Sequence, residues 1–197
     1  MLITRIEKSK GKQYRIYADN TYIFSLYRSE LRKYGIEEGA CIDDALMDTI
    51  MENVIYKRAR ERAFYLLDRQ AYTVSMLRKK LEQGGVPAGI VDRIVDMLIK
   101  YDYLNDHNYV KMFVDNYSGR KSKRQIISAL IAKGIDRQLI FDFFEQNEYS
   151  DDECFKKHYD KYIKGKDLND MKTRQKVFRY FYSKGYAVSV IEDALRQ

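Results

Sequence analysis

Three copies of a segment that ends in glycine constrain this chain more than any other feature. The copies end at Gly85, Gly134 and Gly185, so their spacings are 49 and 51 residues. Residues four apart share one face of a helix. Each copy therefore predicts an amphipathic helix that ends at a left-handed glycine. The apolar residues four and eight positions before each glycine are Leu77 and Leu81, Ile126 and Leu130, and Val177 and Phe181.

Further apolar positions recur on both sides of this segment. They coincide one, five and six residues after the glycine, and an aromatic residue recurs upstream at Phe64, Phe113 and Tyr162. Each repeat is therefore predicted to hold three helices. A fixed period of about 50 residues is typical of arrays in which each repeat covers its neighbour. The predicted fold is mainly α, with tandem three-helix repeats in an elongated, curved array.

The first 45 residues predict a different structure. Residues 2–6, 13–17 and 22–26 are rich in β-forming residues and are separated by turn signals, which predicts a small antiparallel β-meander. Ser29 is predicted to cap a short helix that ends at Gly35. Asp43 or Asp44 is predicted to begin a longer helix that leads into the first repeat.

The domain boundaries follow from these patterns. Residues 1–45 form the predicted β-rich extension with its short helix. The first repeat, with its lead-in helix, covers residues 46–103, the second covers 104–148 and the third covers 149–197. Ser122 and Ser150 are each followed three residues later by Gln or Glu, so both predict a capping box at a helix start.

Positive charge is concentrated in the repeats. Residues 1–55 hold 8 basic and 9 acidic side chains, whereas residues 56–197 hold 28 basic and 20 acidic ones. Recurrent cations could follow a phosphate backbone, because each neutralised phosphate releases counterions. They could equally meet an acidic protein surface or only solvate a helix face. The basic residues cluster within 57–62, 78–80, 120–124, 156–166 and 172–179.

Catalytic and metal-binding patterns are absent from the sequence. It has no phosphate-binding glycine loop and no HExxH motif, and Cys41 and Cys154 are far apart with no CxxC pair. We therefore expect no enzymatic activity, no cofactor and no bound metal. No apolar run approaches the ~20 residues that span a bilayer. The N-terminus also lacks the apolar stretch of a secretory signal, so we expect a cytoplasmic protein without membrane association. We also expect a monomer.

An ordered set of segments in the repeats resembles the RecX family of recombination regulators. The segments are residues 60–81, KYDYLND at 100–106 and LIAKGI at 130–135. They are similar in order and spacing to the family lines "A..LL..R..S..EL..KL...G", "GYLDD.RYA" and "L..KGI". The resemblance covers residues 56–197, and the β-rich start is similar to an extension that some members carry.

This resemblance implies an inhibitor of RecA that acts in DNA repair, DNA recombination and the SOS response. Family members bind along the groove of the RecA filament on single-stranded DNA, and the same partner is expected here, with direct DNA contact left open. We assign the electrostatic role to cations of the repeats and a structural role to the apolar stripes. The candidate residues are Arg58, Arg62, Arg78, Lys79, Lys80, Arg120, Lys121, Lys123, Arg124, Lys172, Arg174 and Lys176.

Two other functions stay open at the level of sequence. A helical-repeat protein with this charge could bind DNA without sequence preference and act without RecA, or it could be a structural adaptor. A helix-turn-helix protein should present base-reading side chains on its recognition helix. Gln125 and Gln175 could read bases, but Met76 and Leu77 could not, which disfavours base readout.

Overall fold

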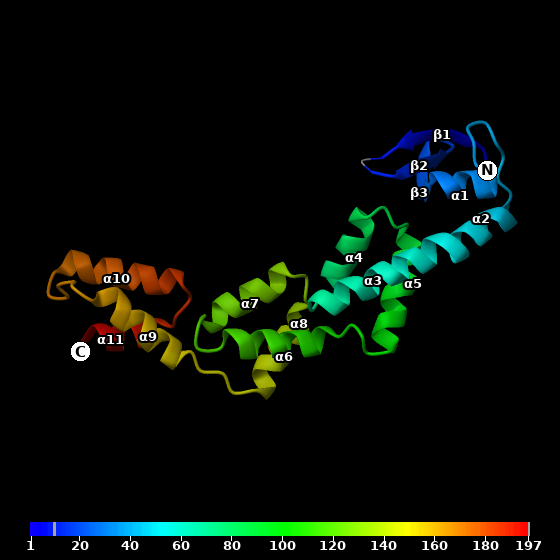
Figure 1. Cartoon of the computed structure of the whole chain (residues 1–197). Coiled ribbons are helices and arrows are strands. Elements are labelled where there is room, and N and C mark those ends of the chain that lie inside the picture. Colours follow the sequence, from blue (N-terminus) through cyan, green and yellow to red (C-terminus); the bar gives the residue numbers. More distant parts are fainter. Residues whose placement is uncertain (10, 197) are drawn as a thin grey trace. The chain divides into compact units, whose positions relative to one another are not determined.

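The computed structural model describes residues 1–9 and 11–196, so Lys10 and Gln197 lie outside the described residues. The chain is mainly helical with one three-stranded sheet at its N-terminal end, and this confirms the predicted fold class (Figure 1). It divides into two compact units, Met1–Leu104 and Asn105–Gln197.

The sheet is an antiparallel meander in the order β1-β2-β3, as the sequence predicts. Its strands are β1 (Ile3–Lys8), β2 (Gln13–Ala18) and β3 (Thr21–Tyr27). Asp19 and Asn20 both have positive φ angles, 47° and 63°, which suit the tight turn of a twisted hairpin. Ile16 pairs with Phe24 across β2 and β3, and both are buried. The sheet therefore has an apolar face that packs into the core of the first unit.

Helix α1 (Arg28–Tyr34) ends at Gly35, whose φ is 63°, as predicted. The predicted Ser29 cap is wrong, because the helix begins at Arg28, two residues earlier than a Ser29 cap implies, and the cap residue is Tyr27. The backbone N–H of Tyr27 instead donates to the Glu30 carboxylate at 2.7 Å. A carboxylate at the third helical position can thus satisfy an N-terminal donor without a serine cap.

A long helical segment leads into the first repeat. It consists of α2 (Asp44–Ile50), the π-helical η1 (Met51–Tyr56) and α3 (Lys57–Arg69). The Asp43 side chain accepts the N–H of Leu46 at 2.7 Å, so Asp43 is the cap of this segment. Ile50 and Ile55 are buried in the same cluster as the sheet.

The remaining helices follow the predicted three-helix plan. In the first unit, α3 is followed by α4 (Val74–Gln83) and α5 (Ala88–Lys100). The second unit contains α6 (Asp106–Tyr117), α7 (Lys123–Ala132) and α8 (Arg137–Gln146), and then α9 (Asp152–Ile163), α10 (Met171–Ser183) and α11 (Val188–Arg196). Among the described residues, the buried apolar side chains of the second unit form two clusters, one within each set of three helices.

The repeated glycine ends three helices in the same way. Gly85, Gly134 and Gly185 have φ angles of 78°, 79° and 88°. The next residue in each case, Val86, Ile135 or Tyr186, donates its N–H to the carbonyl five residues earlier, at 3.2, 3.3 and 3.3 Å. This bond defines a Schellman motif, which needs a left-handed residue. The two apolar residues predicted before each glycine are fully buried in all three copies.

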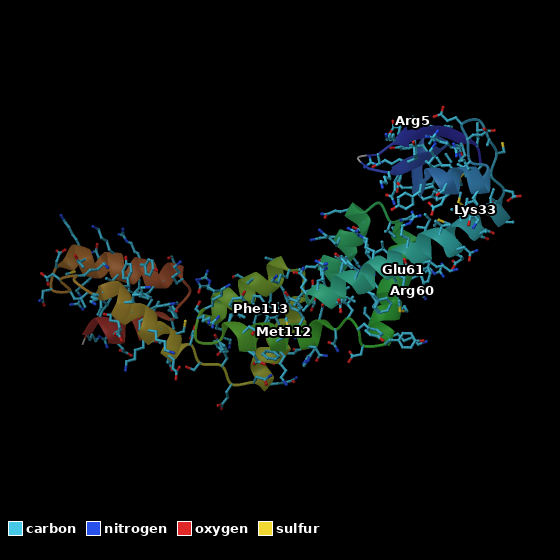
Figure 2. All side chains as sticks on the ribbon, viewed as in Figure 1. Arg5, Lys33, Arg60, Glu61, Met112 and Phe113 are labelled. Atoms are coloured by element: carbon cyan, nitrogen blue, oxygen red, sulfur yellow. The ribbon has the colours of Figure 1, made fainter. Side chains whose placement is uncertain are left out.

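The recurring aromatic position is not buried to the same degree in each repeat. Phe64 is 36% exposed, whereas its repeat equivalent Phe113 is 6% exposed, and the fully buried Ala63 takes the inward position on α3. On α6 the order is reversed: Phe113 is buried, and its neighbour Met112, labelled with it in Figure 2, is 39% exposed.

The predicted capping box at Ser150 also does not form. Helix α9 begins at Asp152, and the Ser150 hydroxyl accepts only its first N–H, that of Asp152, at 3.1 Å. The Asp151 carboxylate accepts the backbone N–H of Lys123 at 2.9 Å. Asp151 therefore connects the start of α9 to the start of α7 and does not cap its own helix.

Candidate functional site

The candidate cations of α4 differ in their freedom to bind a partner. Arg78 forms an ion pair with Asp92 of α5, whereas Lys79 and Lys80 are exposed and form no ion pair among the described residues. An arginine that faces a carboxylate has part of its charge neutralised locally. Lys79 and Lys80 are therefore the stronger candidates on this helix.

Arg58 and Arg62 of α3 lie beside the sheet. The Arg58 guanidinium donates to the Ser25 carbonyl oxygen at 3.1 Å, pairs with Glu30 and lies 4.7 Å from the centroid of the Tyr27 ring. These contacts show a structural role for Arg58, because they join α3 to β3 and α1. Arg62 is exposed and lines a cleft of about 490 Å³ between the sheet and the end of α4.

The cations before and within α7 are partly engaged. The Lys121 ammonium lies 4.1 Å from the centroid of the Tyr117 ring, and that of Lys123 lies 4.9 Å from the centroid of the Phe144 ring. Arg120 and Arg124 are exposed. Ammonium groups on ring faces keep their charge and can still meet an anion. All four candidates therefore retain their positive charge at this end of the second repeat.

Helix α10 presents two exposed candidates, Lys172 and Lys176. The third, Arg174, donates to the Leu195 carbonyl oxygen at 2.9 Å and so holds α10 against α11. Asp170 caps the helix, and hydrogen bonds from the Thr173 hydroxyl and backbone N–H hold the pKa of its carboxyl below the usual value. A capped first turn fixes the positions from which Lys172 and Lys176 project.

Six cations of the second unit line a cleft of about 580 Å³ between the α6–α7 connection and α9–α10. We call it the basic cleft. It is also lined by Gln125, His158, Tyr162, Tyr180 and Phe181, and no carboxylate is among the described lining residues. Its cations are Arg120, Lys121, Lys161, Lys164, Lys166 and Lys184.

Four cations of the basic cleft are not among the candidates from sequence. Lys161, Lys164 and Lys166 belong to the recognised cluster within 156–166, but sequence alone does not show which members of a cluster converge. Lys184 stands alone in sequence, immediately before Gly185. Lys184 lies at the end of α10, beside the second repeat. This position depends on tertiary contacts, which the sequence periodicity does not predict.

Hydrogen bonds connect the second and third repeats around the basic cleft. The Ser122 hydroxyl donates to the Lys184 carbonyl oxygen at 2.6 Å, and the Tyr149 hydroxyl donates to the Lys121 carbonyl oxygen at 3.0 Å. Burial, with the nearby Asp151 carboxylate, raises the pKa of Tyr149 to about 12. Tyr149 therefore stays a neutral hydrogen-bond donor at any physiological pH.

A small polar cluster lies behind the basic cleft, in the core of the third repeat. The Tyr186 hydroxyl oxygen lies 3.2 Å from Cys154 Sγ and 3.0 Å from His158 Nδ1. Burial raises the pKa of Tyr186. Cys154 is fully buried and Cys41 is exposed, and both are free thiols. The side chains of Cys154, His158 and Tyr186 therefore provide hydrogen-bond partners for one another inside the third repeat.

Neither a metal centre nor a membrane span is evident in the described part of the chain. Within residues 1–9 and 11–196, no group of three or more His, Cys, Asp or Glu side chains is placed to hold a metal ion. Over the same residues, no helix has the length and apolar character needed to cross a membrane.

The fold and the surface together define a class: a helical-repeat protein that presents exposed cations on three-helix units. Two family models match the chain, "RecX, first three-helix domain" at residues 59–98 and "RecX, third three-helix domain" at residues 150–195. The chain belongs to the RecX family of regulatory proteins.

Curated relatives extend the match over nearly the whole chain. The chain is 30% identical over 197 residues to the Regulatory protein RecX of Caldanaerobacter subterraneus subsp. tengcongensis, with 99% of this chain and 98% of the relative covered. It is 26% identical over 204 residues to the Regulatory protein RecX of Clostridium acetobutylicum, with 99% and 95% covered.

Solved structures agree with these relatives. A crystal structure of regulatory protein RecX matches with a TM-score of 0.63 and 26% identity, and 97% of each chain is covered. The crystal structure of RecX from Lactobacillus salivarius has a TM-score of 0.62 at 21% identity, with 72% of this chain and 94% of that chain covered. The second match shows a shared fold.

Proposed function

We propose that this chain is a non-enzymatic regulator that binds the RecA filament on single-stranded DNA and inhibits its recombinase activity. The observation that carries the proposal is the full-length similarity to proteins named Regulatory protein RecX. The exposed cations of α4, the α6–α7 connection and α10 support it, because a nucleoprotein filament offers phosphates and acidic protein surfaces. The proposed site of action is the cytoplasm. Inhibition of the filament would lower recombination and repair activity.

We infer that the four predicted segments, 1–45, 46–103, 104–148 and 149–197, divide this task. The three repeats carry the charge that meets the filament. The sheet and the first repeat share one apolar cluster, so the N-terminal extension stabilises the first repeat rather than acting alone. In this division, filament affinity grows with the number of repeats that engage.

The test is binding to RecA-coated single-stranded DNA after charge reversal of exposed lysines. We expect K79E/K80E and K172E/K176E each to weaken binding about tenfold, because every lost phosphate or carboxylate contact removes affinity. The same variants should lose inhibition of strand exchange in proportion. The four lysines form no ion pair among the described residues, and the circular dichroism of each variant should match that of the original chain.

The matched control is K156E/K157E, which makes the same change of charge on α9. Both lysines are exposed, and neither is a candidate for binding. Lys157 faces Glu153 at 3.5 Å, but an exposed pair of this kind contributes little to stability. The control should bind the filament within about twofold of the original chain. If all three variants lose the same affinity for the filament, the effect depends on net charge alone and the assignment of these residues is wrong.

A salt titration separates filament binding from the alternative, sequence-independent DNA binding without RecA. A chain that binds naked DNA through phosphates loses affinity steeply with salt and shows no preference for coated DNA. We expect clearly tighter binding to the coated strand at every salt concentration. Equal affinity for naked and coated strands would favour the alternative, and no binding to either would favour a structural adaptor.

A further inference from the structure

The basic cleft holds more uncompensated charge than any candidate cluster of the first unit. Among the described residues, none of its six cations forms an ion pair, in contrast to Arg58 and Arg78, which both face carboxylates. Like charges that converge on one opening repel each other, and water and salt screen this repulsion only in part. Such an arrangement favours an anion that brings several negative charges at once.

Stacked aromatic rings position two of these ammonium groups. The rings of Tyr162 on α9 and Tyr180 on α10 stack with centroids 4.0 Å apart and an angle of 6° between them. The Lys166 ammonium lies 3.8 Å from the Tyr162 centroid, and the Lys184 ammonium lies 5.5 Å from the Tyr180 centroid. Each cation–π contact holds an ammonium group without neutralising it. The ring pair therefore helps to concentrate positive charge in the cleft.

The same stacking limits what kind of ligand can bind. One face of each ring covers the other ring, and Lys166 lies over the Tyr162 ring, so Tyr162 offers little surface for a nucleobase; Tyr180 is 38% exposed and keeps one outer face, with the Lys184 ammonium 5.5 Å from its centroid. Recognition then depends mainly on charge and on lysine and arginine N–H donors. The volume of about 580 Å³ lies within the range of small-molecule sites. These features fit a compact ligand with closely spaced anionic groups.

We propose that the basic cleft binds a free compact polyphosphate, either inorganic polyphosphate or the phosphate chain of a nucleoside triphosphate. The bound polyphosphate would contact cations from both repeats. Arg120 and Lys121 belong to the second repeat, and the third repeat supplies Lys161, Lys164, Lys166 and Lys184. The polyphosphate would also reinforce the Ser122–Lys184 hydrogen bond that already joins these repeats. The ligand is thus a stabiliser of the second unit, and its binding does not depend on the proposed partner.

The experiment is calorimetric titration of the full chain with sodium tripolyphosphate, without RecA or DNA. We expect one site per chain and a rise in thermal midpoint with ligand concentration. In K161Q/K164Q the affinity should fall at least tenfold, because two cations of the cleft are removed. The comparison variant K156Q/K157Q removes two charges from the same repeat outside the cleft, where Lys157 forms an exposed ion pair with Glu153 at 3.5 Å. Its affinity should stay within about twofold of that of the original chain.

Three further titrations identify the source of the phosphate chain. If ATP binds as tightly as tripolyphosphate and adenosine does not bind, the cleft recognises the phosphates alone. If tripolyphosphate binds and ATP does not, the ligand is the inorganic chain. Absence of binding by both phosphate probes at millimolar concentration overturns the proposal, as do equal losses in the two variants. A thymidine oligonucleotide that tripolyphosphate cannot displace from the cleft would also overturn it, in favour of a single-stranded nucleic acid.

Discussion

At the scale of single residues, the partner of each cation decides whether its charge is available. Arg58 and Arg78 face carboxylates, and Arg174 donates to a carbonyl oxygen of the next helix. Lys79 and Lys172, by contrast, are exposed. Arg120 is an arginine like Arg58 but is exposed, so residue type alone does not separate the two groups. Only the fold distinguishes a cation that holds helices together from one that can meet a partner.

Gly185 offers a prediction at the same scale. Its φ of 88° is unfavourable for other residues, and an added Cβ would lie 2.6 Å from Arg124 Cβ. Gly119 has a similar φ of 71°, but its added Cβ would meet nothing within 4 Å. We expect G119A to lower the free energy of unfolding by about 1 kcal/mol through backbone strain alone. G185A should cost about 2–3 kcal/mol, because Arg124 must also move.

Urea denaturation followed by circular dichroism measures both variants. The difference between them isolates the contact between Gly185 of the third repeat and Arg124 of the second. If the two substitutions cost the same, Arg124 moves aside freely and the two repeats are not in close contact there.

At the scale of elements, the start of α7 serves two repeats. Ser122 caps α7 by accepting the Gln125 N–H at 3.3 Å, and its hydroxyl also donates to the Lys184 carbonyl oxygen at 2.6 Å. Ser122 is fully buried. The end of α10 thereby depends on the cap of α7. A capping residue, normally a local feature, here connects two helices of different repeats.

S122A should therefore cost more than the loss of an ordinary cap. We expect about 2 kcal/mol, since the substitution removes the cap and leaves the Lys184 carbonyl without this donor. The comparison is D136A, because Asp136 caps α8 through exposed hydrogen bonds to Gln138 and Leu139. That change should cost about 1 kcal/mol. Thermal unfolding of both variants decides between a shared and a local cap, and equal midpoints would contradict the shared role.

The sequence predicts the elements well where local chemistry is sufficient. The recurrent glycine ends and the stripes before them are confirmed, because the Schellman motif and helical periodicity depend on nearby residues. Predictions fail where a long-range contact competes with the local pattern. The Asp151 carboxylate, next to the start of α9, accepts the Lys123 N–H, and Ser150 does not form its box. The basic cleft is likewise assembled by tertiary contacts between two repeats.

At the scale of the whole molecule, the apolar clusters follow the division into two units. One cluster joins the sheet, the lead-in helices and the first repeat, and its described members all lie at or before Leu104. The clusters of the second and third repeats lie wholly within the second unit. Each unit of about 100 residues is thus long enough to bury a core of its own.

The final prediction tests this division by cutting the chain. Fragments 1–104 and 105–197 should each unfold cooperatively, and their far-ultraviolet circular dichroism should add up to that of the full chain, because no described cluster is divided. A cut after residue 132 is the control, since it separates Ile126 and Leu130 from Ile135 and Ile140 of the same cluster. That cut should remove the helical signal of the second repeat. If either fragment of the first pair is unfolded alone and regains helix only on mixing, the two units stabilise each other and the division is wrong.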